Sequence, residues 1–164
     1  MKKILLTLMA VFAFGLQHVN AQDAPLKIVT NNPDFTIKVK RCAASGKTVI
    51  IDLLLNNVGT NDIDVEEVRG GGGTYISEAY DDEGNIYQSD NLKVKIANRA
   101  SYEVYDTGKF SIPSGVPMRL SIQISNVPQS AESIARLKLI FFCKAWGLGP
   151  DKPVRISNIP ITRD

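Results

Sequence analysis

Apolar and polar residues alternate along most of the chain, and this alternation predicts β-strands. The stretch around which the others are arranged is Thr48–Asn57, which carries apolar side chains at both strand parities. Such a strand is typical of the centre of a sheet that is covered on each face. A buried helical segment is the alternative, but the β-branched start and the Asn-Asn-Val-Gly end favour a strand.

The segments around this strand place apolar residues at every second position, as half-buried strands do. Clusters of Gly, Pro, Asn and Asp separate the segments and predict turns. From the candidate segments named below we expect about eight or nine strands, mostly antiparallel, with a hairpin around Gly84. The candidate strands are Leu26–Thr30, Phe35–Val39, Ile63–Val68, Tyr75–Tyr80, Asn85–Gln88, Leu92–Ala97, Lys109–Ile112, Arg119–Ser125, Leu137–Cys143 and Val154–Ile161.

Two local irregularities are also expected. Gln129–Ile134 is predicted to form one short helical turn, with Ser130 as its cap. In Val154–Ile161 the apolar residues change parity, and a bulge near Ser157-Asn158 would keep all of them pointing inward. Many short strands separated by turns predict an all-β sandwich and not a βαβ fold.

The first 21 residues have the features of a signal peptide. Two lysines precede an apolar stretch over Ile4–Leu16, and small residues end at Ala21. We predict cleavage between Ala21 and Gln22, which leaves residues 22–164 as a single domain. An N-terminal membrane anchor is the alternative, although the apolar stretch is short for a spanning helix. The processed chain is thus expected to be periplasmic, cell-surface or secreted, without a membrane span.

Removal of this segment changes the charge and the histidine content. The 19 basic residues become 17, because two lysines are lost, and they balance 17 acidic residues. A neutral chain does not predict a basic groove for nucleic acid or anionic lipid. His18 is the only histidine and is also removed. The processed chain therefore lacks the histidine of a Ser-His-Asp or Cys-His nucleophile and of a His-containing zinc site, and no cofactor is expected.

Four phrases in order resemble a group of exported immunoglobulin-like domains of unknown function from Gram-negative bacteria. They are V-I-I-D-L-L-L-N-N-V-G, A-Y-D-D-E-G-N-I-Y, I-P-S-G-V-P-M-R-L-S-I and I-S-N-I-P-I, within Phe35–Ile161. The resemblance implies an immunoglobulin-like β-sandwich in the envelope or outside the cell, and it transfers no functional residue. The Cys…Trp…Cys order of true immunoglobulin domains is absent, because Trp146 follows Cys143.

Cys42 and Cys143 remain after processing, in a compartment where disulfides persist. A bridge would close a loop of about 100 residues and, in the chain-entropy model, stabilise the fold by roughly 4–5 kcal/mol. Cys143 shares its parity with Phe141, whereas Cys42 has the parity opposite to Val39. A bulge at Arg41, or a strand end before Cys42, would remove this objection to a bridge. A disulfide and two separate thiols both stay open.

Oxygen ligands of the kind that calcium prefers gather in the predicted hairpin, at Asp81, Asp82 and Asn85. Their spacing is not that of an EF-hand, and a hairpin turn requires the same residue types. No metal site is therefore assigned, and these three residues stay weak candidates.

Glycine and tyrosine are concentrated in loops that could form a contact surface. Four consecutive glycines predict a surface loop, and no motif beside them makes it a phosphate cradle. Tyrosine offers a large contact area at a low entropy cost, although these tyrosines can also be ordinary strand aromatics. The binding-loop candidates are Gly70, Gly71, Gly72, Gly73, Tyr75, Tyr102, Tyr105 and Trp146.

We predict a non-catalytic binding module that contacts an envelope or extracellular protein or glycan through these loops. One alternative is a glycan hydrolase that uses carboxylates such as Asp52 or Asp106. Such an enzyme needs two carboxyl groups about 5–10 Å apart in a cleft. Another alternative is a structural domain stabilised by calcium.

Overall fold

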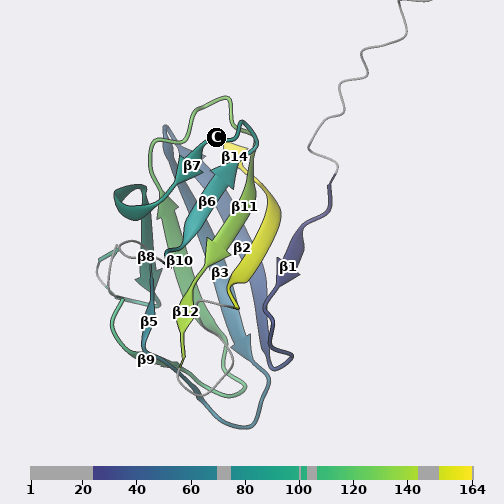
Figure 1. Cartoon of the computed structure of the whole chain (residues 1–164), viewed down its shortest axis with the longest axis vertical. Coiled ribbons are helices and arrows are strands. Elements are labelled where there is room, and N and C mark those ends of the chain that lie inside the picture. The colour runs from purple at the N-terminus through teal and green to yellow at the C-terminus, as the bar shows by residue number, and fades with distance from the viewer. Residues whose placement is uncertain (1–23, 70–74, 100, 103–106, 144–151, 164) are drawn as a thin grey trace, which may run out of the picture.

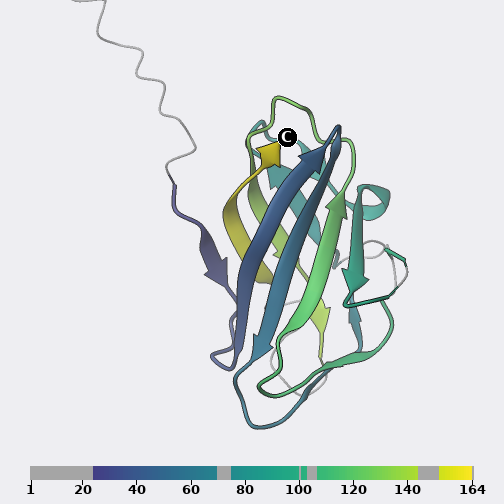
Figure 2. The ribbon, with the colours of Figure 1, turned by 180° about the vertical axis from the view of Figure 1, so that it is seen from behind.

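The computed structural model describes residues 24–69, 75–99, 101–102, 107–143 and 152–163. These residues form an all-β structure with two five-stranded sheets and two small two-stranded sheets. The large sheets lie face to face as two layers, and the hydrophobic core fills the space between them (Figures 1 and 2). This arrangement is consistent with a β-sandwich. Among the described residues, no helix has the length and apolarity needed to cross a membrane.

The strands of the first large sheet, in spatial order, are β1 (Lys27–Val29), β13 (Val154–Pro160), β11 (Ser133–Leu139), β6 (Glu78–Asp81) and β7 (Ile86–Tyr87). Those of the second are β14 (Thr162–Arg163), β2 (Phe35–Ser45), β3 (Thr48–Asn57), β10 (Met118–Ile124) and β8 (Leu92–Ile96). The small sheets pair β12 (Phe141–Phe142) with β5 (Glu67–Val68), and β4 (Ile63–Val65) with β9 (Phe110–Ile112). A 3-10 turn, η2 (Ser89–Asn91), precedes β8.

β3 is the central strand of its sheet, with β2 on one side and β10 on the other. The apolar side chains of β3 that point inward are fully buried. The sequence predicts that the other face of the strand is covered as well, but that face is only partly covered. On that face Ile50 and Leu54 are half-buried at the outer surface. Leu54 lies between Lys38 of β2 and Arg119 of β10 in the sheet, so the aliphatic stems of these two side chains can shield it. The buried hydrophobic residues of β3 are Val49, Ile51, Leu53 and Leu55.

The core also joins the large sheets to the small ones. Phe35 of β2 meets Phe141 of β12 edge to face, with ring centroids 5.6 Å apart and an interplanar angle of 73°. Both side chains are fully buried. An aromatic pair of this geometry contributes about 0.5–1.5 kcal/mol beyond the burial of its area.

The parity change expected in the last long strand occurs at Asn158. This residue has φ +59° and lies between inward-facing Ile156 and Ile159, both fully buried. Its side-chain amide donates a hydrogen bond to the carbonyl oxygen of Pro25 at 3.1 Å, ahead of β1. Beyond it, Ile161 packs partly buried against the core, so the apolar residues on both sides of the irregularity point inward.

Three expectations about local structure are wrong. The region predicted as a helical turn instead contains one turn hydrogen bond, from the Ala131 amide to the Pro128 carbonyl, and β11 starts at Ser133. The segment 63–68 is divided between β4 and β5, which pair with different partners. The described part of the chain also has more strands than eight or nine, because the large sheets alone contain ten.

Replacement of Leu53 with alanine is expected to lower the free energy of unfolding by about 2–5 kcal/mol, because it leaves a cavity in the fully buried core. Leu54→Ala on the same strand is the matched control and is expected to cost about 1 kcal/mol or less, since Leu54 is half-buried. Urea denaturation of the processed chain measures both. Equal losses for the two variants would contradict the assignment of inner and outer faces.

Candidate functional site

One lateral edge of the molecule is open. On this edge β1 pairs with β13 at three positions, and β14 pairs with β2 only at Ala43 and Ala44. From Thr36 to Arg41, β2 therefore has no neighbouring strand on this side among the described residues. β1 and β2 lie next to each other along this edge, on the right of Figure 1 and the left of Figure 2.

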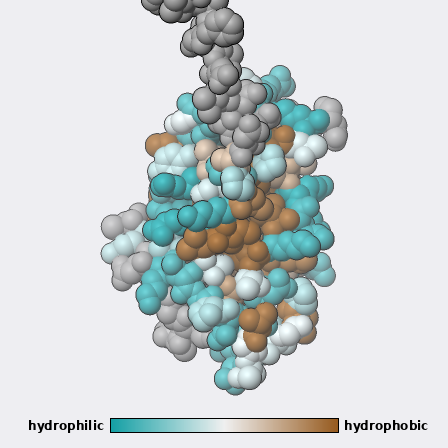
Figure 3. Space-filling model, turned by 90° about the vertical axis from the view of Figure 1, so that its right-hand side faces the viewer, coloured by the Kyte–Doolittle hydropathy of each residue, from teal (hydrophilic) through white to brown (hydrophobic). Residues whose placement is uncertain are grey.

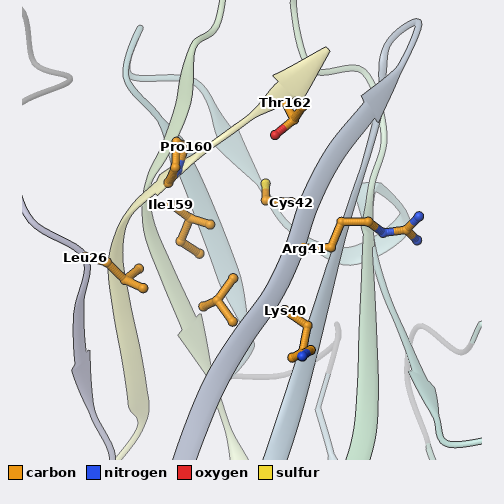
Figure 4. A pocket seen from close by; sticks show the side chains of 8 residues that line it. Leu26, Lys40, Arg41, Cys42, Ile159, Pro160 and Thr162 are labelled. Carbon is orange, nitrogen blue, oxygen red and sulfur yellow. The ribbon is translucent and has the colours of Figure 1, made fainter. Parts of the chain in front are cut away.

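A groove with a volume of about 280 Å³ follows this edge. One wall comes from β13, β14 and the residue before β1, and the other wall comes from β2 (Figure 4). Figure 3 shows a hydrophobic patch on the same side of the molecule. Leu26, at the rim, is 46% exposed. The lining residues are Leu26, Val39, Lys40, Arg41, Cys42, Ile159, Pro160 and Thr162.

A β-bulge at Lys40 shapes the β2 wall. The register of β2 with β3 shifts between Val39 and Arg41, so the strand parity changes at this point. As a result, Val39 before the bulge and Cys42 after it share one parity, and both line the groove. Arg41 runs away from Leu26 across the sheet (Figure 4). The bulge that could turn Cys42 inward is therefore present.

The two cysteines are nevertheless separate thiols. Burial raises the pKa of Cys42 to about 12, although the nearby charge of Arg163 lowers it. Burial, together with Asp64 and Glu66, raises the pKa of Cys143 to about 12. Of the two alternatives left open by the sequence, the structure has the free thiols. Thiols held protonated in this way react slowly with oxidants and electrophiles.

Asp52, on the outer face of β3, holds two arginines, of which Arg41 lines the groove. Its Oδ2 accepts from Nε of Arg41 at 2.9 Å and lies 2.9 Å from Nη2 of both Arg41 and Arg119. Its Oδ1 accepts from the Ser121 hydroxyl at 2.6 Å and from Nε of Arg119 at 3.3 Å. Arg41 and Ser121 are the cross-strand neighbours of Asp52, so the sheet register itself assembles the cluster.

The cluster keeps its carboxylate charged. Burial by itself raises the pKa of Asp52, but the hydrogen bonds of Ser121 and Arg119 and the charges of both arginines outweigh it, so the pKa lies below its ordinary value. The Asp52 side chain is only 7% exposed, whereas both arginine side chains are 56% exposed. A general acid needs a raised pKa, so this arrangement suits an anchor that orients Arg41 beside the groove.

The outer face of this sheet is strongly basic, although the processed chain is neutral. Asp52 is its only acidic residue among the described strands, and Nζ of Lys95 lies 5.5 Å from the ring centroid of Tyr102. Tyr102, one of the loop candidates, is thereby placed beside this face. The cationic residues of the face are Lys38, Arg41, Lys93, Lys95 and Arg119.

The weak metal candidates form a hairpin turn. The Asp81 carboxylate accepts from the amides of Glu83 and Asn85, from the Asn85 side chain and from the Tyr87 hydroxyl, at 2.6–3.1 Å. The Asp82 carboxylate accepts from the amide of Glu132 at 3.1 Å. These bonds engage the carboxylate oxygens of Asp81 and Asp82 in holding the turn. No group of three or more His, Cys, Asp or Glu side chains in the described part of the chain could hold a metal ion.

Of the remaining candidates from the sequence, Tyr75 is 46% exposed and lies at the start of a described segment. The following candidates lie outside the described residues: Ala21, Gln22, Gly70, Gly71, Gly72, Gly73, Tyr105, Asp106 and Trp146.

The groove was not among the sequence predictions. Its residues come from three distant segments of the chain, near Leu26, Lys40 and Ile159, and no sequence motif joins them. The one available signal was the parity change between Val39 and Cys42, which indicated a bulge but not what would border it.

No family model matches the chain, and no curated protein sequence matches it. Among solved structures, the chain is similar to part of a family 123 glycoside hydrolase from Clostridium perfringens, whose structural analysis addressed glycolipid glycan hydrolysis. The TM-score is 0.39 and the sequence identity is 12%; the match covers 85% of this chain and 27% of the hydrolase chain. This chain thus spans about a quarter of that enzyme's length, and a likeness at this level carries no argument about function.

Asp52→Asn is expected to lower the free energy of unfolding at neutral pH by about 1–2 kcal/mol, because two arginines lose their shared counter-charge. Since the pKa of Asp52 is lowered in the folded state, its contribution is complete above the ordinary value of 3.8 and is lost as the pH falls through the lowered value. Urea denaturation from neutral to acid pH measures the difference, with Asp90→Asn as an exposed control. A difference that does not shrink in acid would contradict this role.

Thiol titration is expected to find both cysteines reduced in the processed chain purified without reductant. Ellman's reagent in guanidinium should detect two thiols. In the native protein both should react slowly, because Cys42 is buried, Cys143 is half-buried and the pKa of each is raised to about 12. Cys143→Ser should leave one reactive thiol. A wild-type chain with no titratable thiol would instead show a disulfide.

Proposed function

We propose that the processed chain is an exported, non-catalytic interaction module of immunoglobulin-like architecture. It binds a segment of another envelope or extracellular protein in the groove on the open edge. The observation that carries this proposal is the groove itself, a concave and largely aliphatic surface with exposed Leu26 at its rim. The contact surface that we propose is therefore the open edge between the two large sheets, in place of the loops that the sequence suggested.

The chemistry of the groove favours a polypeptide over a glycan. No aromatic side chain lines it among the described residues, and its walls combine aliphatic groups with an unpaired strand edge. A polypeptide segment can use both, because it carries apolar side chains and main-chain donors and acceptors at regular intervals.

Two further observations support a module that binds and does not react. Asp52, the described carboxylate that the sequence offered for hydrolysis, is held ionised between Arg41 and Arg119. The only histidine of the chain lies in the segment predicted to be removed on export. The same signal-peptide features support an envelope or extracellular location.

A photo-crosslinking residue in place of Leu26 is expected to give a discrete adduct with an envelope protein in the cells that produce this chain. The matched control is Ile86, an apolar residue that is 56% exposed on β7, the edge strand at the opposite side of the same sheet. Excess purified processed chain should compete for the Leu26 adduct. Adducts of the same identity and yield from both positions, or none from Leu26, would contradict the proposal.

A further inference from the structure

Two residues of β2 at the open edge have main-chain groups without a hydrogen-bond partner among the described residues. The Val58 amide donates to the Asp34 carbonyl at 2.8 Å, which places Asp34 and, four residues later, Lys38 at the positions that exchange hydrogen bonds with β3. Ile37 and Val39 occupy the alternate positions, so their N–H and C=O groups point away from β3. Among the described residues, nothing on the open side hydrogen-bonds to them.

The inner side of this edge is apolar. Ile37 and Val39 pack in or against the hydrophobic core, and Val39 lines the groove together with Leu26 and Ile159 of the opposite wall. In a strand laid beside β2, every second side chain would enter the groove between these walls. Apolar side chains at those positions would cover Leu26, which is 46% exposed.

The outer side of the edge is cationic. Lys38 and Lys40 of β2 are exposed, and neither takes part in an ion pair within the described part of the chain. Arg41 follows at the end of the open run, oriented by Asp52. The other half of the side chains of an added strand would stand beside these cations, where carboxylates are favourable cross-strand neighbours.

We infer that the partner segment proposed above binds as an additional β-strand beside β2, with apolar side chains directed into the groove and acidic side chains directed outward. This inference rests on the proposed function and specifies its partner as an extended peptide in which apolar and acidic residues alternate. Main-chain hydrogen bonds to Ile37 and Val39 pair the peptide with β2. The groove selects its apolar side chains, and the lysines select its acidic side chains.

A second copy of the chain is a poorer occupant of this edge. Two β2 strands paired edge to edge would bring Lys38 and Lys40 of one copy beside those of the other, and like charges at cross-strand positions are unfavourable. Lysines and bulges also protect edge strands from aggregation. Protection accounts for Lys38 and the bulge at Lys40, but it does not account for an apolar groove behind them. The same lysines would disfavour the pairing of most other strands with β2 and favour a strand that carries acidic side chains.

The test uses the processed chain and a fluorescent short peptide of alternating valine and glutamate. We expect saturable binding by fluorescence anisotropy, and slower hydrogen exchange at the Ile37 and Val39 amides in the complex. A peptide of the same composition with its valines and glutamates in separate blocks should bind at least about tenfold more weakly. The alternating peptide with N-methyl groups on both edges should lose affinity to the same extent, because it cannot then donate main-chain hydrogen bonds to β2 in either direction.

Charge-reversed variants locate the site. Lys38→Glu with Lys40→Glu is expected to weaken the alternating peptide by about tenfold or more. Lys93→Glu with Lys95→Glu, which reverses two lysines on the opposite edge strand of the same sheet, is the matched control and should change the affinity by less than about twofold.

Three outcomes would overturn the inference. They are no saturable binding up to about 1 mM peptide, undiminished binding of the N-methylated peptide, and equal losses in the two charge-reversed variants. A concentration-dependent dimer that protects the Ile37 and Val39 amides without peptide would assign the edge to a second copy instead. If crosslinking from Leu26 succeeds but the alternating peptide does not bind, the proposed function is retained and binding by strand addition is contradicted. If the Leu26 adduct is absent, the proposed function itself is contradicted.

Discussion

The segment Val154–Arg163 serves both large sheets, and the open edge follows from that division. β13 runs in the first sheet, and the chain then crosses at Ile161, whose amide donates to the Glu132 carbonyl at 2.8 Å. Thr162 and Arg163 then pair with β2 as the parallel strand β14. Arg163 fixes this segment by donating to the carbonyl oxygens of Pro128 and Ala131. Because β14 pairs with β2 at two positions only, the rest of β2 has no neighbouring strand on this side among the described residues, and the groove lies behind it.

Two aspartates show how a buried carboxylate organises its surroundings in this fold. Asp52 is surrounded by arginines and a serine from the strands on either side, so it fixes charged side chains on a sheet face. Asp81 accepts its hydrogen bonds within a few residues of its own hairpin, so it fixes a turn. In both, hydrogen bonds lower the pKa more than burial raises it. The sequence alone offered both residues as candidates for chemistry, whereas their partners indicate structural roles.

Local alternation predicted many of the strands and failed where pairing between distant segments decided the outcome. β3, β8 and β10 lie where their periodic apolar residues predict them, because one buried face imposes a period of two. Ile134 was assigned to a helical turn, but its side chain is fully buried and it pairs with Ile159 in β13. That pairing depends on a partner strand about 25 residues away, so a window of neighbouring residues does not contain it.

By itself, the sequence determined that the chain is all-β, where its hairpin turns, and that Cys42 needs a bulge or a strand end before it to leave the outward parity. These properties depend on side-chain periodicity and turn chemistry, which are local. Only the tertiary structure decided that Asp52 meets Arg41 and Arg119, that both thiols stay free, and that Leu26, Val39 and Ile159 line one groove. The physical reason is that register and sheet order, which bring distant residues together, depend on the packing of the whole core.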